Sequence, residues 1–115
     1  MNERIHLLAR LEASKSVYRF RLGAVIFRRD KVLGRGFNTP NKTHPQSLAP
    51  YKTRCAEFNS YINAVNLGIS PNKLQGASLY VHRIKKDGSP GLAKPCEFCK
   101  RFLDQVGIKD IQYSR

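Results

Sequence analysis

The spacing of three cysteines constrains this chain of 115 residues more than any other feature. Cys96 and Cys99 follow Pro95 and are three residues apart, so both thiols lie on one face of a helical turn. Cys55 supplies a third sulfur about forty residues earlier. Three thiolates with an open fourth position predict a catalytic zinc site, because structural sites usually close with a fourth protein ligand. A chain that binds zinc in this way must bring the two segments together.

Two other interpretations of the cysteines are open. The thiols could be buried hydrophobic side chains with a coincidental spacing, or His44 could close a structural zinc site as the fourth ligand. An odd number of cysteines with a metal-like spacing argues against a disulfide framework. It indicates thiols that stay reduced inside a cell.

Glu57 lies two positions after Cys55, and we predict that it carries protons during catalysis. Both residues fall in the first turn of a predicted helix, where unpaired N–H groups and the helix dipole favour a thiolate. Three thiolates and Zn²⁺ have a formal sum of −1, which opposes ionisation of a nearby water. We expect a cation beyond the ligands to offset this charge, first Arg54 and then Lys94 or Lys100.

Length and charge describe one basic domain over residues 1–115. The formal net charge is +13, and such a field attracts polyanions, which favours a phosphate-bearing substrate. The alternative is a solvated basic surface with no special partner. No segment resembles a signal peptide or a membrane span, so we expect a cytoplasmic protein with no membrane partner.

Periodicity and turn residues predict a mainly parallel sheet with helices on both faces, preceded by an antiparallel hairpin. The second helix is expected to have a buried stripe of Phe58, Ile62 and Val65, continued by Ile69. Gly34 and Gly36 are expected to mark a close approach of backbones. The ligand site should lie where helix starts converge at the strand ends. The elements are expected as helices over 2–16, 55–67 and 95–107, strands over 18–27, 32–38, 77–84 and 109–113, a loop over 39–53 and a turn over 70–73.

The predicted loop over 39–53 carries three prolines and no periodicity, and loops of this length in small domains are usually functional. Asn38 at its start, with His44 and Tyr51 within it, offers groups that bind a sugar, a phosphate or a base. A solvated connection is the alternative for each of these residues.

The sequence resembles the cytidine deaminase-like superfamily, and within it phage-type deaminases related to cytidine and deoxycytidylate deaminases. The resemblance rests on five motifs: Gly23-Ala24-Val25-Ile26, Gly36-Phe37-Asn38-Thr39-Pro40, Cys55-Ala56-Glu57, Leu92-Ala93-Lys94-Pro95-Cys96-Glu97-Phe98-Cys99 and the closing segment from Val106 to Ser114. It implies a three-layer α/β/α sandwich with a mixed sheet of four to five strands.

The resemblance also implies one zinc ion per subunit, held by Cys55, Cys96 and Cys99, with Glu57 as general acid and base. It implies that Asn38 contacts the sugar and that the backbone at Ala56 and Pro95 borders the base pocket. Cys55 is similar to the first ligand of the free-nucleoside branch, whereas the segment before Pro95 is similar to deoxycytidylate and tRNA deaminases. Members usually carry a further strand, so we expect an exposed edge in the last strand and a homo-oligomer.

These observations predict zinc-dependent hydrolytic deamination of cytosine to uracil. The expected substrate is a cytidine or deoxycytidine nucleotide, or single-stranded DNA or RNA. The alternatives are an inactive zinc-containing module that binds nucleic acid and an adenine-directed deaminase. A phage-encoded enzyme acting in the host cytoplasm is consistent with the resemblance.

Overall fold

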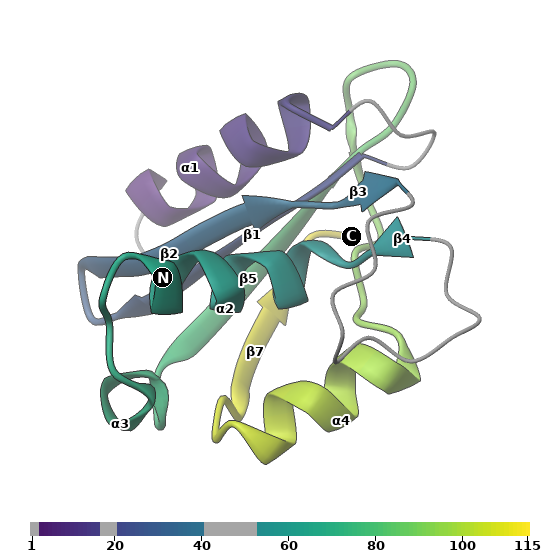
Figure 1. Ribbon diagram of the computed structural model, residues 1–115. Helices are drawn as coiled ribbons and strands as arrows, with labels where there is room; N and C mark the ends of the chain where they lie inside the picture. Colours follow the sequence, from purple (N-terminus) through teal and green to yellow (C-terminus); the bar gives the residue numbers. More distant parts are fainter. Residues whose placement is uncertain (1–2, 17–20, 41–52) are drawn as a thin grey trace.

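A computed structural model describes residues 3–16, 21–40 and 53–115, and it shows three layers with a sheet in the middle (Figure 1). Helix α1 covers one face of the sheet, and α2 and α4 lie on the other, which confirms the predicted α/β/α sandwich. The helices are α1 (Glu3–Ser14), α2 (Ala56–Asn66), α3 (Pro71–Leu74) and α4 (Glu97–Gln105). No helix in these described ranges has the length and apolar character needed to cross a bilayer.

The main sheet is mixed and has five strands in the order β2-β1-β5-β6, with β7 also paired to β5. Its strands are β1 (Arg21–Arg28), β2 (Lys31–Phe37), β5 (Ser78–Ile84), β6 (Pro90–Gly91) and β7 (Asp110–Tyr113). Only β5 and β7 pair in parallel, so the expectation of a mainly parallel sheet is wrong. Strand β1 lies between β2 and β5 and is antiparallel to both. The connection through α2 therefore joins β2 to β5, which run in the same direction but are not neighbours.

Strand β1 is buried on both faces, and its side chains alternate between two cores. Ala24 and Ile26 belong to the apolar cluster under α2 and α4, whereas Val25 and Phe27 belong to the cluster under α1. Four successive buried residues thus follow the period of two expected of a strand. The central position of β1 explains its continuous apolar run.

Helix α2 packs its small residues directly on the glycines of β2. A Cβ atom at Gly34 would lie 2.5 Å from the Ser60 carbonyl oxygen and 2.6 Å from the Ala64 Cβ. This contact confirms the predicted close approach.

Of the predicted buried stripe, Phe58 is buried, Ile62 is half-buried and Ile69 packs partly buried against the core. The prediction is wrong for Val65, which is 38% exposed.

Several predicted boundaries also differ from the structure. Residues 39–40 and 53–54 form a small antiparallel pair, β3 (Thr39–Pro40) and β4 (Thr53–Arg54), at the ends of the predicted loop. The predicted turn over 70–73 forms α3, whose first residue is Pro71. Helix α4 starts after its N-cap Cys96, so Pro95 lies before the helix and not at its first position.

Candidate metal centre

The three cysteines converge at the starts of two helices. Cys55 is the N-cap of α2 and Cys96 is the N-cap of α4, while Cys99 lies in the first turn of α4. Their sulfur atoms all lie within 4.8 Å of one another. Tetrahedral zinc with Zn–S bonds of about 2.3 Å separates its sulfurs by roughly 3.8 Å, so the donor set fits this ion in kind and in spacing.

Exposure of the cysteines changes across the cluster, which gives it an open side. Cys99 is fully buried, Cys55 is half-buried and Cys96 is exposed. In the described part of the chain, no histidine or carboxylate joins this group as a fourth ligand. His44, the alternative fourth ligand, lies outside the described residues.

The three thiols share protons because they lie so close together. Hydrogen bonding from Cys55 and Cys99 lowers the pKa of Cys96 to about 2, with further help from backbone N–H groups at the start of α4. The hydrogen bond with Cys96 raises the pKa of Cys55, those with Cys55 and Cys96 raise the pKa of Cys99, and burial raises both further. The protein alone thus favours one thiolate, and a bound divalent cation is the natural means of ionising the other two.

Glu57 lies in the first turn of α2 and lines the same cavity as Cys55 and Cys96. Its side chain is almost fully enclosed, and this burial raises the pKa of Glu57 to about 7. A carboxyl group with a pKa near neutrality can both accept and donate a proton under physiological conditions. The structure therefore brings the predicted proton carrier to the predicted ligands.

The cavity itself measures about 230 Å³, which is below the range of drug-sized pockets and suits a ligand the size of a base with part of its sugar. Its described lining consists of Leu22, Asn38, Cys55, Glu57, Arg83, Leu92, Ala93, Lys94 and Cys96.

Asn38 is held in this wall by backbone contacts across β1 and β2. Its Oδ1 accepts a hydrogen bond from the Leu22 N–H at 2.9 Å, and its own N–H donates to the Leu22 carbonyl at 3.1 Å. The hydroxyl of Ser16 donates to the Asn38 carbonyl at 3.1 Å. The amide therefore reaches the cavity in a fixed orientation.

Ser114 fastens the opposite wall, although it lies far from the cysteines in sequence. Its hydroxyl accepts from the Arg83 N–H at 2.9 Å and donates to the Gly91 carbonyl at 2.7 Å. Its backbone accepts from the Ala93 N–H and donates to the Val81 carbonyl, each at 2.9 Å. No role in the site was predicted for Leu22, Arg83 or Leu92. The pairing of β1 and β5 brings Leu22 and Arg83 here, and Leu92 follows β6 in the segment that leads to Cys96.

The remaining predicted site residues have different positions. Lys94 is exposed and lines the cavity, whereas Lys100 is exposed on α4 and does not. Ala56 and Pro95 flank the lining cysteines in the chain, and their place at a base pocket stays a prediction. The predicted contacts His44 and Tyr51, and the side chain of Arg54, lie outside the described residues.

Comparisons with known proteins agree with this geometry. The family described as cytidine and deoxycytidylate deaminase zinc-binding region matches residues 1–115. No curated protein sequence matches the chain significantly.

Solved structures share the fold at low sequence identity. Deoxycytidylate (dCMP) deaminase from the cyanophage S-TIM5 is 21% identical with a TM-score of 0.60, and the match covers 98% of this chain and 84% of that one. Cytidine deaminase from Burkholderia pseudomallei is 20% identical with a TM-score of 0.67, covering 93% and 78%. The chain therefore belongs to the cytidine and deoxycytidylate deaminase zinc-binding family.

Proposed function

We propose that this protein catalyses the zinc-dependent hydrolytic deamination of cytosine in a phosphate-bearing substrate. The observation that carries the proposal is the convergence of three sulfurs and the Glu57 carboxyl group at one cavity. Family membership supports the reaction class. The buried carboxyl group beside the cysteines does not favour an inactive binding module, which has no use for a proton carrier there.

Cys55, Cys96 and Cys99 would hold one zinc ion per chain. When bound, the ion supplies a Lewis acid that makes water a nucleophile near neutral pH. The sulfurs lie at the N-terminal ends of α2 and α4, where the positive ends of the helix dipoles would offset the excess negative charge of three thiolates.

Glu57 would move the protons of the reaction. It accepts a proton from the water that attacks C4 of the cytosine ring, and it donates a proton to the ring nitrogen N3. It then assists transfer of a proton to the exocyclic nitrogen, so that the C4–N bond breaks and ammonia leaves. Uracil keeps the oxygen of the attacking water as its new carbonyl.

Substrate binding would use the walls of the cavity. Asn38, fixed by Leu22, would donate to or accept from the sugar, and Leu22 and Leu92 would contact the base. Lys94 would meet a phosphate at the open side. A structure of the cyanophage deaminase is a complex with dCMP and dUMP, which supports a cytosine nucleotide as the substrate here.

Measurement of ammonia release from zinc-loaded protein tests the proposal. The panel covers cytidine, deoxycytidine, their monophosphates, short single-stranded DNA and RNA, and adenosine as the adenine counterpart. We expect release from at least one cytosine compound and none from adenosine. Absence of release from every cytosine compound would contradict the proposal.

Glu57→Gln identifies the proton carrier within that assay. It should keep zinc and fold but lower turnover by about 10²- to 10⁴-fold, the usual contribution of a positioned acid and base. Glu97→Gln is the matched control, because Glu97 is an exposed carboxylate in the first turn of α4. Wild-type turnover by Glu57→Gln would remove Glu57 from this role.

We also retain the prediction of a homo-oligomer in the cytoplasm. In the described part of the chain, β7 pairs only with β5, so its other edge has backbone groups available to a second copy. Sedimentation at several protein concentrations tests this association.

A further inference from the structure

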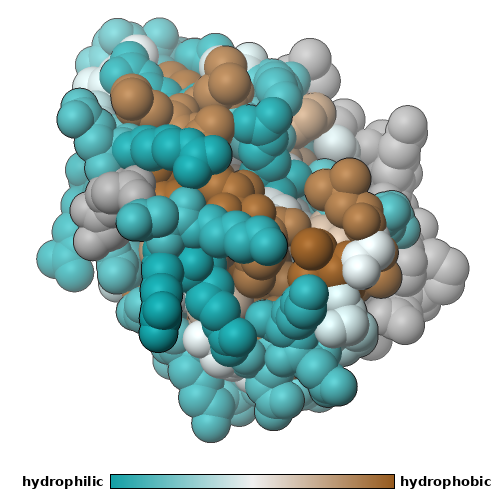
Figure 2. All heavy atoms as spheres, turned by 90° about the vertical axis from the view of Figure 1, so that its left-hand side faces the viewer, coloured by the Kyte–Doolittle hydropathy of each residue, from teal (hydrophilic) through white to brown (hydrophobic). Residues whose placement is uncertain are grey.

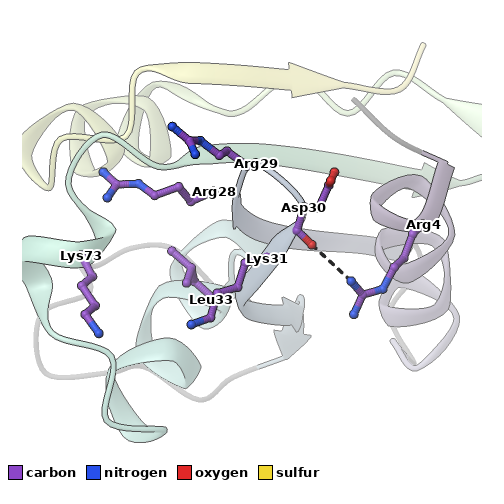
Figure 3. Close-up of a pocket in the computed structure, with 7 residues that line it drawn as sticks. All are labelled: Arg4, Arg28, Arg29, Asp30, Lys31, Leu33 and Lys73. Atoms are coloured by element: carbon purple, nitrogen blue, oxygen red, sulfur yellow. Dashed lines mark hydrogen bonds between the residues drawn. The ribbon is translucent and has the colours of Figure 1, made fainter.

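A second cavity lies away from the cysteines and measures about 940 Å³. It lies beside the turn between β1 and β2, and α1 and α3 complete its rim (Figure 3). Its lining residues are Arg4, Arg28, Arg29, Asp30, Lys31, Leu33 and Lys73, and we call this set the basic groove.

The basic groove concentrates positive charge around an open space. Five of its seven lining residues are cationic, and one is a carboxylate. Figure 2 shows the molecule from this side, with long hydrophilic side chains spread over a hydrophobic interior. Cations held close together repel one another, and an anion bound among them relieves that repulsion.

Backbone contacts hold two of the arginines in place. Arg4 Nη1 donates to the Asp30 carbonyl oxygen at 3.2 Å, which ties α1 to the turn (Figure 3). Arg28 Nη2 donates to the Gln75 carbonyl oxygen at 2.9 Å, which ties β1 to the segment after α3. The rim of the groove is thus pre-organised, and an incoming ligand loses less entropy in ordering it.

Arg29 adds a conformational observation to the charge. Its φ angle is +56°, in the left-handed region that favours glycine or asparagine in tight hairpin turns. An arginine here retains a cost that glycine would avoid, and in return it directs a guanidinium group to the groove. A positively charged side chain at this strained position is explained if it binds an anionic ligand.

The composition of the lining indicates which part of a ligand the groove binds. No aromatic residue is among the described residues that line it, so it offers no platform for stacking a base. Arginine and lysine side chains bind phosphate oxygens without regard to base identity. The groove is therefore suited to a phosphate backbone.

The groove is also separated from the candidate metal centre. Leu22 lines the metal-centre cavity and Arg28 lines the groove, at opposite ends of β1. Six strand residues span about 20 Å. A single mononucleotide is too short to fill both places, so the groove needs its own ligand or a longer one.

We propose that the basic groove binds the phosphate backbone of nucleic acid without sequence preference. The proposal concerns binding at a second place on the molecule and does not rest on the proposed deamination. If both hold, the groove anchors a strand whose cytosine is processed at the other end of β1.

The test measures binding of a short fluorescent oligothymidylate to the zinc-loaded protein across about 50 to 200 mM salt. A strand without cytosine separates this binding from recognition at the metal centre. The variant Lys31→Glu/Lys73→Glu changes two exposed groove residues, and Lys85→Glu/Lys86→Glu changes two exposed lysines in the turn after β5. Each Lys→Glu removes two charges, so both variants lower the formal net charge of +13 by the same four.

We expect Lys31→Glu/Lys73→Glu to weaken binding at least tenfold and to reduce the salt slope by about 1 to 2. Lys85→Glu/Lys86→Glu should weaken it less than about threefold by the same electrostatic reasoning. Equal losses in both variants, no loss in either, or no binding by the unchanged protein would overturn the proposal. Binding of tripolyphosphate without binding of the strand would also overturn it, in favour of a small polyphosphate ligand.

Ammonia release from the best substrate of the free-nucleotide panel is measured alongside. Lys31→Glu/Lys73→Glu should leave it unchanged, because neither residue lines the metal-centre cavity. If no compound releases ammonia while oligothymidylate binding follows the expected pattern, the proposed function fails and the groove stands.

Discussion

On the face under α2 and α4, the polar groups of Cys55, Cys96 and Glu57 line a cavity that opens to solvent. On the face under α1, His82 is 1% exposed and shares a hydrogen bond of 3.0 Å with the Tyr80 hydroxyl. The ring of His6 lies edge-on to His82, with centroids 4.9 Å apart. Polar groups of the α1 face thus contact one another, whereas those of the other face line a cavity that can admit a ligand.

The contrast indicates why burial alone does not identify a site. Both faces enclose ionisable side chains, and burial shifts the pKa of His82 as it shifts that of Glu57. Only Glu57 has a cavity and a set of soft ligands beside it. A shifted pKa becomes a functional indication when a substrate can reach the group.

The largest difference between the two faces is expected when one of the proposed zinc ligands is removed. Cys99→Ala should lower bound zinc from one per chain to less than a tenth, because two sulfurs hold the ion poorly. Loss of the ion should lower the free energy of unfolding by about 4 kcal/mol when free zinc exceeds its Kd a thousandfold. Metal analysis and urea unfolding measure both quantities.

His82→Gln is the matched variant on the α1 face. It should keep a full complement of zinc, since His82 contacts Tyr80 and His6 on the α1 face of the sheet. A zinc-loaded Cys99→Ala protein, or a zinc-free His82→Gln protein, would erase the distinction between the two faces.

Gly23→Ala tests how closely the α1 face is packed. A Cβ atom there would collide with the Ala9 carbonyl oxygen and the Ala13 nitrogen, both backbone atoms of α1. Because backbone cannot move aside locally, we expect a loss of about 3 kcal/mol in the free energy of unfolding, with zinc content unchanged. Urea unfolding measures the loss.

Gly88→Ala provides the comparison for this substitution. A Cβ atom at Gly88 meets nothing within 4 Å, and only its φ of +86° opposes the change. We expect about 1 kcal/mol from the backbone conformation alone. Equal losses at Gly23 and Gly88 would show that α1 tolerates displacement.

The pH dependence of the free energy of unfolding should include a contribution from His82, which is buried on the α1 face. Burial, with smaller effects of His6 and Arg10, lowers the pKa of His82 to about 4 from its usual 6.5. Between these values the unfolded chain binds a proton at His82 that the folded chain does not, so His82 lowers stability as the pH drops from 6.5 towards 4. This contribution should reach about 2 to 3 kcal/mol and then stop, because below pH 4 both states are protonated. Glu57, whose pKa is raised to about 7, acts in the opposite direction over the same range, so the His82 contribution is the difference between the unchanged protein and His82→Gln.

Urea unfolding at pH 7 and pH 4.5 measures this contribution. The neighbouring Tyr80 hydroxyl stays uncharged over this range, because burial raises its pKa. His82→Gln should remove the corresponding part of the slope. An unchanged slope in that variant would assign the pH dependence to other groups.

The smallest effect is expected at the exposed rim of the metal-centre cavity. Lys94→Ala should lower kcat/KM for a phosphorylated substrate by less than about tenfold, because solvent and salt screen an exposed charge. Its effect should shrink further at high salt, with Lys86→Ala as the control. Arg54→Ala, predicted from the sequence to aid metal retention or turnover, belongs to the same series, and no change in either quantity would remove Arg54 from that role.

Local chemistry made part of this structure predictable. The residue types and spacing of Cys55, Cys96 and Cys99 predicted the cluster, and Gly34 and Gly36 predicted a close backbone approach without indicating that α2 makes it. The antiparallel hairpin of β1 and β2 was predicted, but the antiparallel pairing of β1 with β5 was not, since strand order depends on which distant segments pair. Leu22 and Arg83 reach the cavity through that pairing, and nothing in their neighbouring sequence indicates it.

The hydrogen bonds of Ser114 have a consequence for how such a site varies. Through its hydroxyl on Gly91 and its backbone carbonyl on Ala93, this one residue positions the wall that leads to Cys96. Substitutions at the end of β7 would therefore shift this wall of the cavity and change turnover in small steps, while the cysteines and Glu57 stay the same. The residues that form and support the cavity are distributed from Asn38 to Ser114, so no short peptide from the chain would reproduce the site.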